Sequence, residues 1–177
     1  MLFRDGFSST LIAAVIFTAT LAFGQAPAPA PFTPHQLKPN VYWIEGGGGN
    51  SGVIVGDKGV IVIDAKTTPA GGKELLDNIA KITPKPVTTV ILTHSDGDHV
   101  NGLASFPAGI TIIAHENNKK EQEAALAAGG RGAPPADHLP TQLVSKNKEN
   151  LKVDGVKLEL VKSSISAVTT DEDAAKA

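Results

Sequence analysis

The residues most able to do chemistry lie in one short segment, THSDGDHVNG, at residues 93–102. Within six positions it carries two histidines and two aspartates, namely His94, Asp96, Asp98 and His99. Imidazole and carboxylate groups together suit zinc, manganese or iron. Gly97 between the aspartates allows the backbone to turn sharply, so that several of these side chains can converge. We therefore predict that the segment forms part of a metal site.

Two other readings of the segment use the same residues. A solvated polar turn remains an alternative, because aspartate, glycine and asparagine are common turn residues. A calcium-binding EF-hand loop fits poorly. Counted from Asp96, its fifth position should offer an oxygen ligand and its sixth should be glycine, and these are Val100 and Asn101.

A glycine-rich run, GGGNSG at residues 47–52, matches the letters of a dinucleotide-binding loop. Such a loop leads from a strand into a helix, whose free amide groups bind the pyrophosphate. Here the run lies between two expected strands, which argues against a nucleotide site. We interpret it as a flexible turn that could form a lip over a neighbouring site.

Hydrophobic patterns and turn signals predict the elements that position these residues. Short β-branched strands are expected at 41–45, 51–56 and 59–64, as an antiparallel meander. A helix over 70–82 leads to a buried strand that ends at the histidine segment, and a strand at 109–115 leads to a second helix ending at Gly129. A hairpin is expected around Asp154-Gly155. This alternation predicts an α/β fold with a mixed sheet and flanking helices, and loops at strand ends of such sheets form ligand sites.

Composition separates the ends of the chain from its middle. Residues 1–24 are typical of a signal peptide, since the apolar run is shorter than the roughly 20 residues of a membrane span. Residues 25–36 form an Ala/Pro-rich spacer, 37–162 the folded domain and 163–177 a disordered tail. The 177 residues contain no cysteine, which excludes disulfides and thiolate ligands, and the net charge of −2 gives no basic footprint for nucleic acid. We expect an exported protein, periplasmic or secreted by a bacterium, without a stable membrane span after cleavage.

The strand followed by THSDGDHVNG resembles the metal-binding signature H-x-H-x-D-H of the metallo-β-lactamase superfamily. The segments GNSGVIVGDKGVIVIDA, VTTVILTH and ITIIAHENN resemble the N-terminal half of that αββα sandwich. The resemblance implies a hydrolase in which a metal-bound hydroxide attacks an ester, thioester, lactone or lactam of a small-molecule substrate. It also implies zinc as the cofactor, two ions in a complete protein, with manganese or iron as alternatives.

The resemblance also implies residue roles. His94 would bind the first metal, Asp98 and His99 the second, and Asp98 would in addition act in catalysis by positioning the nucleophile. Asp96 stands where the signature has its second histidine, and it would bind metal through oxygen. Asp64, which closes the third strand of the meander, matches a position that supports and orients the ligands.

The remaining ligands of the family come from its C-terminal half, and no histidine follows His138 in this chain. We therefore expect a chain that stops before those ligands. We expect His35 to be a bystander in the spacer, His115 to be structural or to start a helix, and His138 to be solvated. The alternative to a hydrolase is a non-catalytic protein that binds one divalent ion, or a fragment whose sheet a partner chain completes. An incomplete sandwich also predicts self-association.

Overall fold

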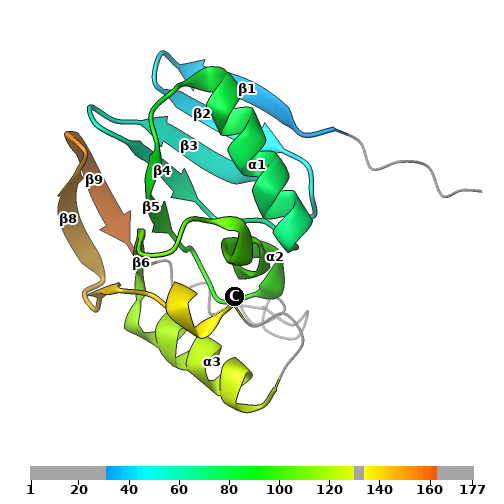
Figure 1. Cartoon of the computed structure of the whole chain (residues 1–177). Coiled ribbons are helices and arrows are strands. Elements are labelled where there is room, and N and C mark those ends of the chain that lie inside the picture. The colour runs from blue at the N-terminus through cyan, green and yellow to red at the C-terminus, as the bar shows by residue number, and fades with distance from the viewer. Residues whose placement is uncertain (1–30, 130–133, 163–177) are drawn as a thin grey trace, which may run out of the picture.

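The computed structural model describes residues 31–129 and 134–162, and a seven-stranded sheet forms its centre (Figure 1). In order across the sheet the strands are β1 (Thr33–Lys38), β2 (Val41–Glu45), β3 (Ser51–Val55), β4 (Val60–Ile63), β5 (Val87–Ile91), β6 (Thr111–His115) and β7 (Gln142–Val144). Neighbours from β1 to β4 run antiparallel and those from β4 to β7 run parallel. The sheet is mixed, as the sequence predicts. The expected signal peptide and the expected tail lie outside the described residues.

Helices connect the parallel strands, as expected from the alternating pattern. They are α1 (Pro69–Ile82), α2 (Gly97–Val100), η1 (Asn101–Ser105), α3 (Glu116–Ala127) and η2 (Ala136–His138). Helix α1 begins where Thr68 accepts a hydrogen bond from the Gly71 amide, with Pro69 in the first turn. It ends just before Pro84, whose ring cannot continue a helix.

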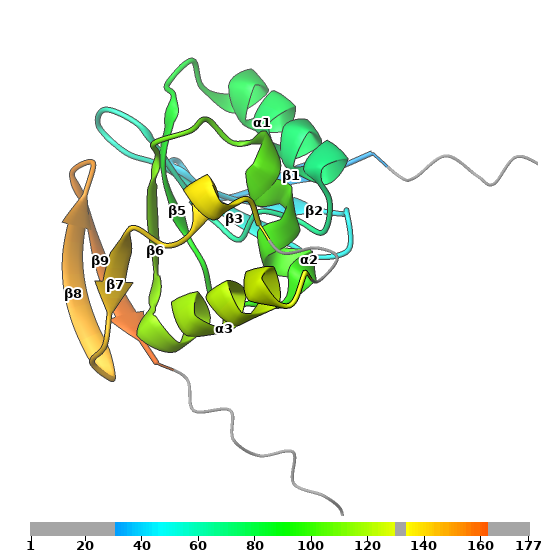
Figure 2. The same ribbon diagram turned by 60° about the horizontal axis from the view of Figure 1, so that its bottom comes forward.

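Each face of the sheet has its own apolar layer. Helix α1 packs on one face, where Leu75 and Ile79 join a core cluster with strand residues such as Val62 and Val90. The hairpin of β8 (Lys148–Val153) and β9 (Val156–Val161) packs on the other face, and Leu158 contacts a second cluster there. Figures 1 and 2 both show the hairpin on the side opposite α1. The described part of the chain thus forms three layers, with the sheet between α1 and the hairpin.

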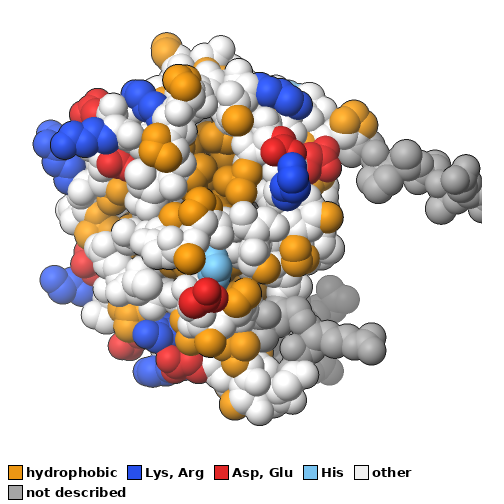
Figure 3. All heavy atoms as spheres, in the orientation of Figure 1, with side chains coloured by type: hydrophobic (Ala, Val, Ile, Leu, Met, Phe, Trp, Pro, Cys, Tyr) orange, Lys and Arg blue, Asp and Glu red, His pale blue; other side chains and the backbone are white. Residues whose placement is uncertain are grey.

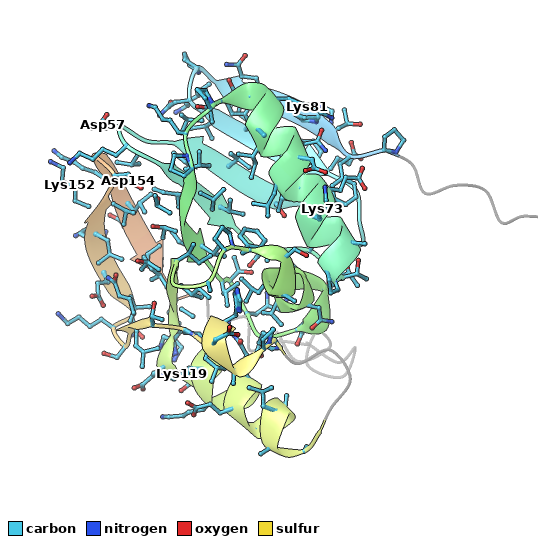
Figure 4. All side chains as sticks on the ribbon, in the orientation of Figure 1. Asp57, Lys73, Lys81, Lys119, Lys152 and Asp154 are labelled. Atoms are coloured by element: carbon cyan, nitrogen blue, oxygen red, sulfur yellow. The ribbon has the colours of Figure 1, made fainter. Side chains whose placement is uncertain are left out.

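The tip of this hairpin is held by hydrogen bonds to the turn between β3 and β4 and to β5. Asp154 and Gly155 form the turn with φ of 47° and 82°, as expected of an Asp-Gly hairpin. The Asp57 amide donates to the Asp154 carbonyl at 2.7 Å, and the Thr88 hydroxyl donates to the Asp154 carboxylate. Figure 4 shows Asp57 and Asp154 close together at this tip. These polar contacts set the register of the hairpin on the sheet.

The sheet begins earlier than predicted. Strand β1 starts at Thr33, inside the range expected as spacer, and pairs along β2 as an edge strand, where Pro34 is tolerated. His35, expected to be a bystander, stacks on Trp43 with ring centroids 4.5 Å apart and pairs with Glu45 at 3.1 Å. Cross-strand contacts with β2 give this segment its structure, and the Ala/Pro-rich composition did not predict them.

The surface is ordinary for a globular domain. Figure 3 shows apolar side chains in the middle of one face and most charged side chains around its edge. Lys73 and Lys81 extend outward from α1 (Figure 4). In the described part of the chain, no helix combines the length and the apolar character needed to cross a membrane.

Helix α1 meets η1 through two glycines. A Cβ on Gly102 would overlap the Ala65 carbonyl oxygen, and a Cβ on Gly72 would overlap the Gly102 carbonyl oxygen. The Gly102 amide donates to the Lys66 carbonyl at 2.9 Å. This close approach brings η1, and with it the end of the histidine segment, against the turn after β4.

Gly102→Ala should therefore destabilise the protein by about 3 kcal/mol, because the added methyl overlaps backbone that cannot move freely. Gly109→Ala is the control. Gly109 has φ of 80° but has no atom within 4 Å of its Cβ position, so only the backbone cost of about 1 kcal/mol is expected. Urea unfolding of both variants measures the difference. Equal destabilisation of the two would contradict a required close approach.

Candidate metal centre

The predicted site residues come together at the carboxyl ends of β4 and β5. Asp64 directly follows β4, and the histidine segment begins one residue after the end of β5, the parallel neighbour of β4. One set of possible ligand atoms, all within 4.8 Å of one another, comes from Asp64, His94 and His99. A second set comes from His94, Asp96 and Asp98. The structure therefore gathers all five predicted residues at one edge of the sheet.

The Asp64 carboxylate is the centre of the hydrogen-bond network. It is 5% exposed and accepts three hydrogen bonds. The Thr93 amide donates at 2.9 Å, the Thr93 hydroxyl at 2.6 Å, and Nδ1 of His99 at 2.8 Å. These partners offset the cost of burying the charge. Three of the roughly four acceptor positions of the carboxylate are used, so Asp64 is better suited to orient the histidines than to bind a metal itself.

The same network places a hydrogen on Nδ1 of both imidazoles. Nδ1 of His99 carries the hydrogen that it donates to Asp64, so Nε2 of the neutral ring has a free electron pair. The Thr93 hydroxyl has only one hydrogen and donates it to Asp64. It must therefore accept from Nδ1 of His94, 2.8 Å away, which leaves Nε2 of His94 free. One buried carboxylate thus directs two nitrogen ligands, one of them through Thr93.

The free nitrogens face carboxylate oxygens. Nε2 of His99 lies 3.2 Å from Oδ2 of Asp98, and Nε2 of His94 lies 3.7 Å from Oδ2 of Asp96. Two ligands of a tetrahedral zinc ion, each about 2.1 Å from the metal, lie ~3.4 Å apart. Electron-pair donors that face one another at such distances need a cation or a proton between them. The described residues fit a divalent metal in both chemistry and spacing.

The site is open on the side of His94 and Asp96. The side chain of His94 is 45% exposed and that of Asp96 is 76% exposed, whereas His99 is largely buried. Asp96 precedes α2 but its side chain makes no capping hydrogen bond, so its oxygens are available. Ser95 donates to the Glu121 carboxylate, which ties this loop to α3. A cavity of about 390 Å³ borders His94 and reaches between the sheet and the end of β9.

A glycine segment, residues 46–49, forms another wall of the site. A Cβ on Gly49 would lie 3.2 Å from the Asp98 carbonyl oxygen and 3.8 Å from Nε2 of His99. The segment was expected to be a flexible lip, and it does lie beside the site. It is also held by Lys66, whose Nζ donates to three backbone carbonyls. Burial lowers the pKa of Lys66 from 10.5 to about 8, while the nearby Glu74 carboxylate opposes this shift.

The other histidines of the domain have structural roles. His115 caps α3 by accepting from the Asn117 amide at 3.1 Å, in line with the expected helix-start role. His138 was expected to be solvated, and this is wrong, since it is 6% exposed. Its Nε2 is hydrogen-bonded to the Phe106 carbonyl at 3.0 Å, and its Nδ1 to Oδ1 of Asp137 at 2.9 Å. The bond to Asp137 lowers the pKa of the Asp137 carboxyl. The Gly/Pro-rich sequence around His138 concealed these contacts.

Sequence reasoning missed two residues of the site. Thr93 links Asp64 to His94, and its position directly before the first histidine was the available signal. Lys66 lies two positions after Asp64 and gave no signal of burial, because lysine is almost never buried without partners.

Comparisons with known proteins agree with this arrangement. The family model described as "Metallo-beta-lactamase superfamily" matches residues 44–162. Among curated proteins, the 2,4-dinitroanisole O-demethylase subunit alpha of Nocardioides sp. is 30% identical over 131 residues, which cover 73% of this chain and 38% of that protein.

Two solved structures have a similar fold. The stereoselective inverting sec-alkylsulfatase of Pseudomonas sp. aligns with a TM-score of 0.63 and 23% identity, over 73% of this chain and 27% of that one. A subclass B3 metallo-beta-lactamase of Bradyrhizobium japonicum aligns with a TM-score of 0.60 and 26% identity, over 73% of this chain and 51% of that one. The chain thus spans about half, or less, of the length of these proteins.

Asp64→Asn should weaken zinc binding by about 10–100-fold, because the amide cannot accept from Thr93 and His99 as the carboxylate does, and both imidazoles lose their orientation. Zinc titration with a competing chelator measures the affinity. Asp77→Asn is the matched control, since Asp77 lies exposed on α1 and pairs only with Lys73. If both variants bound zinc as tightly as the unaltered chain, Asp64 would have no part in orienting ligands.

Proposed function

Because the chain belongs to the metallo-beta-lactamase superfamily, we propose that it provides the metal centre of an exported metal-dependent hydrolase that acts on a small-molecule ester, thioester, lactone or lactam. The single observation that supports this most is the pair of imidazoles whose Nε2 atoms are freed by one Asp64 network. Zinc is the proposed cofactor, with manganese or iron as alternatives. Export is proposed from the sequence of residues 1–24.

Each proposed ligand has a distinct part in the centre. His94 and His99 would hold metal through Nε2, and Asp98 and Asp96 through carboxylate oxygens. A bound divalent metal would supply Lewis acidity, polarising the bond to be cleaved and lowering the pKa of a water near it to ~7. Asp98, 3.2 Å from Nε2 of His99, would orient the attacking group and hold a proton during the reaction.

Asp96 distinguishes this centre from the H-x-H-x-D-H signature. Its carboxylate replaces an imidazole, which adds a negative charge and a harder oxygen ligand. It is the most exposed of the four ligands that we propose. We therefore propose that Asp96 makes the centre less selective for zinc over manganese than an imidazole would.

One observation favours a second candidate function, in which the chain binds one divalent ion without catalysis. The half-exposed His94 and the exposed Asp96 leave one side of the centre open. In the described residues, His35 and His138 have partners elsewhere, and His115 caps α3 through Nδ1 while its buried Nε2 has no hydrogen-bond partner. Residues of a partner chain could complete the open side.

Asp98→Ala should weaken zinc binding at least about tenfold, which corresponds to ~1.4 kcal/mol. It should also abolish any hydrolysis, because the same carboxylate orients the attacking group. Titration of the full chain with zinc, followed by assays with a chromogenic ester, a thioester, a lactone and a β-lactam, tests both effects. Asp77→Ala is the matched control.

The outcomes separate the two candidates. Zinc-dependent hydrolysis that requires Asp98 supports the hydrolase. Tight zinc binding without hydrolysis of any of the four substrates supports the ion-binding protein. No zinc binding by the folded chain would overturn both.

Asp96→His should raise the zinc-to-manganese affinity ratio by about tenfold, because imidazole prefers zinc and the lost carboxylate prefers harder ions. Competitive titration of the two metals measures the ratio, and Asp77→His controls for an added surface histidine. An unchanged ratio would mean that Asp96 does not contact the metal.

A further inference from the structure

Lys66 is a buried cation that the proposed chemistry does not use. It is 1% exposed, the largest of the fully buried side chains in the described residues. Its backbone has φ of 79°, a left-handed conformation that is strained for a residue with a side chain. A strained and buried lysine persists only where surrounding contacts determine its position.

The ammonium of Lys66 is surrounded by carbonyl oxygens. Nζ donates to the carbonyls of Ile44 at 2.8 Å, Gly46 at 2.8 Å and Gly49 at 2.6 Å. It also lies 4.8 Å from the centre of the Phe32 ring, a distance suited to a cation–π contact. All three hydrogens of the ammonium are used, and the carbonyls they bind bracket the glycine segment from its beginning to its end.

The glycine segment has few other means of holding its shape. Gly46, Gly47 and Gly48 have φ of 109°, 73° and 90°, and their lack of side chains leaves them with high conformational entropy when free. Among side-chain hydrogen bonds in the described residues, the only other one to this segment is from the Thr67 hydroxyl to the Gly47 carbonyl, at 2.9 Å. Lys66 therefore supplies two of the three side-chain hydrogen bonds to the segment, and the Phe32 ring packs against Gly46 and Gly47.

The position of the segment matters because Gly49 lies against His99. The Cβ position of Gly49 is 3.8 Å from Nε2 of His99, the nitrogen left free for a ligand. The His99 backbone is held by the turn after β4, since the Ala65 amide donates to the His99 carbonyl at 2.7 Å. A movement of the glycine segment would widen or narrow the space in front of Nε2.

We propose that Lys66 is a positioning residue that holds the glycine segment as a fixed wall over Nε2 of His99 and so limits the size of the group that can reach this nitrogen. Lys66 touches neither metal nor substrate in this role. It acts through the carbonyls of Gly46 and Gly49. The proposal deepens the proposed function, because this space would be part of the substrate site.

Chemical modification of His99 in the metal-free full chain tests the proposal. Diethyl pyrocarbonate carbethoxylates an unprotonated imidazole nitrogen, and peptide mass mapping gives the rate at each histidine. The rate at His99 relative to His35 should rise several-fold in Lys66→Met, because the wall is no longer held. NMR order parameters of the glycine amides should fall from about 0.85 to below about 0.6.

The chain offers matched controls and a rescue. Lys73→Met removes an exposed lysine that pairs with Asp77, and it should leave the relative rate unchanged. Since the chain has no cysteine, Lys66→Cys can be alkylated selectively with 2-bromoethylamine in the unfolded state and then refolded. This rebuilds an ammonium at nearly the length of lysine, and it should restore both the slow modification and the ordered amides.

A second variant tests the wall without altering Lys66. Gly49→Ala places a methyl group in front of Nε2, and Gly49 does not have a left-handed φ that would add strain. It should slow modification of His99. This test remains available if Lys66→Met does not fold. An unchanged relative rate in either folded variant, or a raised rate that the rebuilt ammonium fails to lower, would overturn the proposal. Because no metal is added, failure of zinc binding would count against the proposed function alone.

Discussion

The candidate centre depends on the hydrogen bonds that the buried Asp64 carboxylate accepts. Burying a carboxylate is costly unless it is hydrogen-bonded, and here three donors satisfy it. Two of those donors belong to Thr93, which in turn accepts from His94, and the third is the His99 ring. The requirement to satisfy one buried charge therefore holds both imidazoles through Nδ1, and Nε2 of each ring lies beside an aspartate oxygen. The arrangement of the candidate ligand atoms follows from the electrostatics of this buried charge.

The turn after β4 connects this network to the rest of the domain. Asp64 and Lys66 both have left-handed backbones, with φ of 62° and 79°. Each has compensating contacts, Asp64 with the histidine segment and Lys66 with the glycine segment. The peptide groups of the turn add two more links, from Ala65 to the His99 carbonyl and from Lys66 to the Gly102 amide. Two segments, the glycine segment and the histidine segment, are thus fixed to one strained turn, as is common at functional sites.

The two faces of the sheet explain why such a turn can be held. Helix α1 and η1 cover one face and the β8–β9 hairpin covers the other, so β4 and β5 are buried and their ends cannot shift easily. This fold is similar to those of a metallo-beta-lactamase and an alkylsulfatase, of which the chain spans about half or less. The cavity beside His94 lies where the hairpin ends, so any substrate would meet the open side of the centre there.

The sequence by itself determined the mixed α/β sheet, the Asp-Gly hairpin and the clustering of His94, Asp96, Asp98, His99 and Asp64. These features depend on local patterns, namely β-branched strands, helical periodicity and a dense run of ligand types, and on the rule that parallel strands end at one edge. Only the tertiary structure decided the roles of Lys66, Thr93 and His138. Their partners lie in distant segments. Lysine, threonine and histidine are also found on solvated surfaces, so no local pattern marks these three as buried or hydrogen-bonded. The early start of β1 was hidden for the same reason, because its stability comes from pairing with β2.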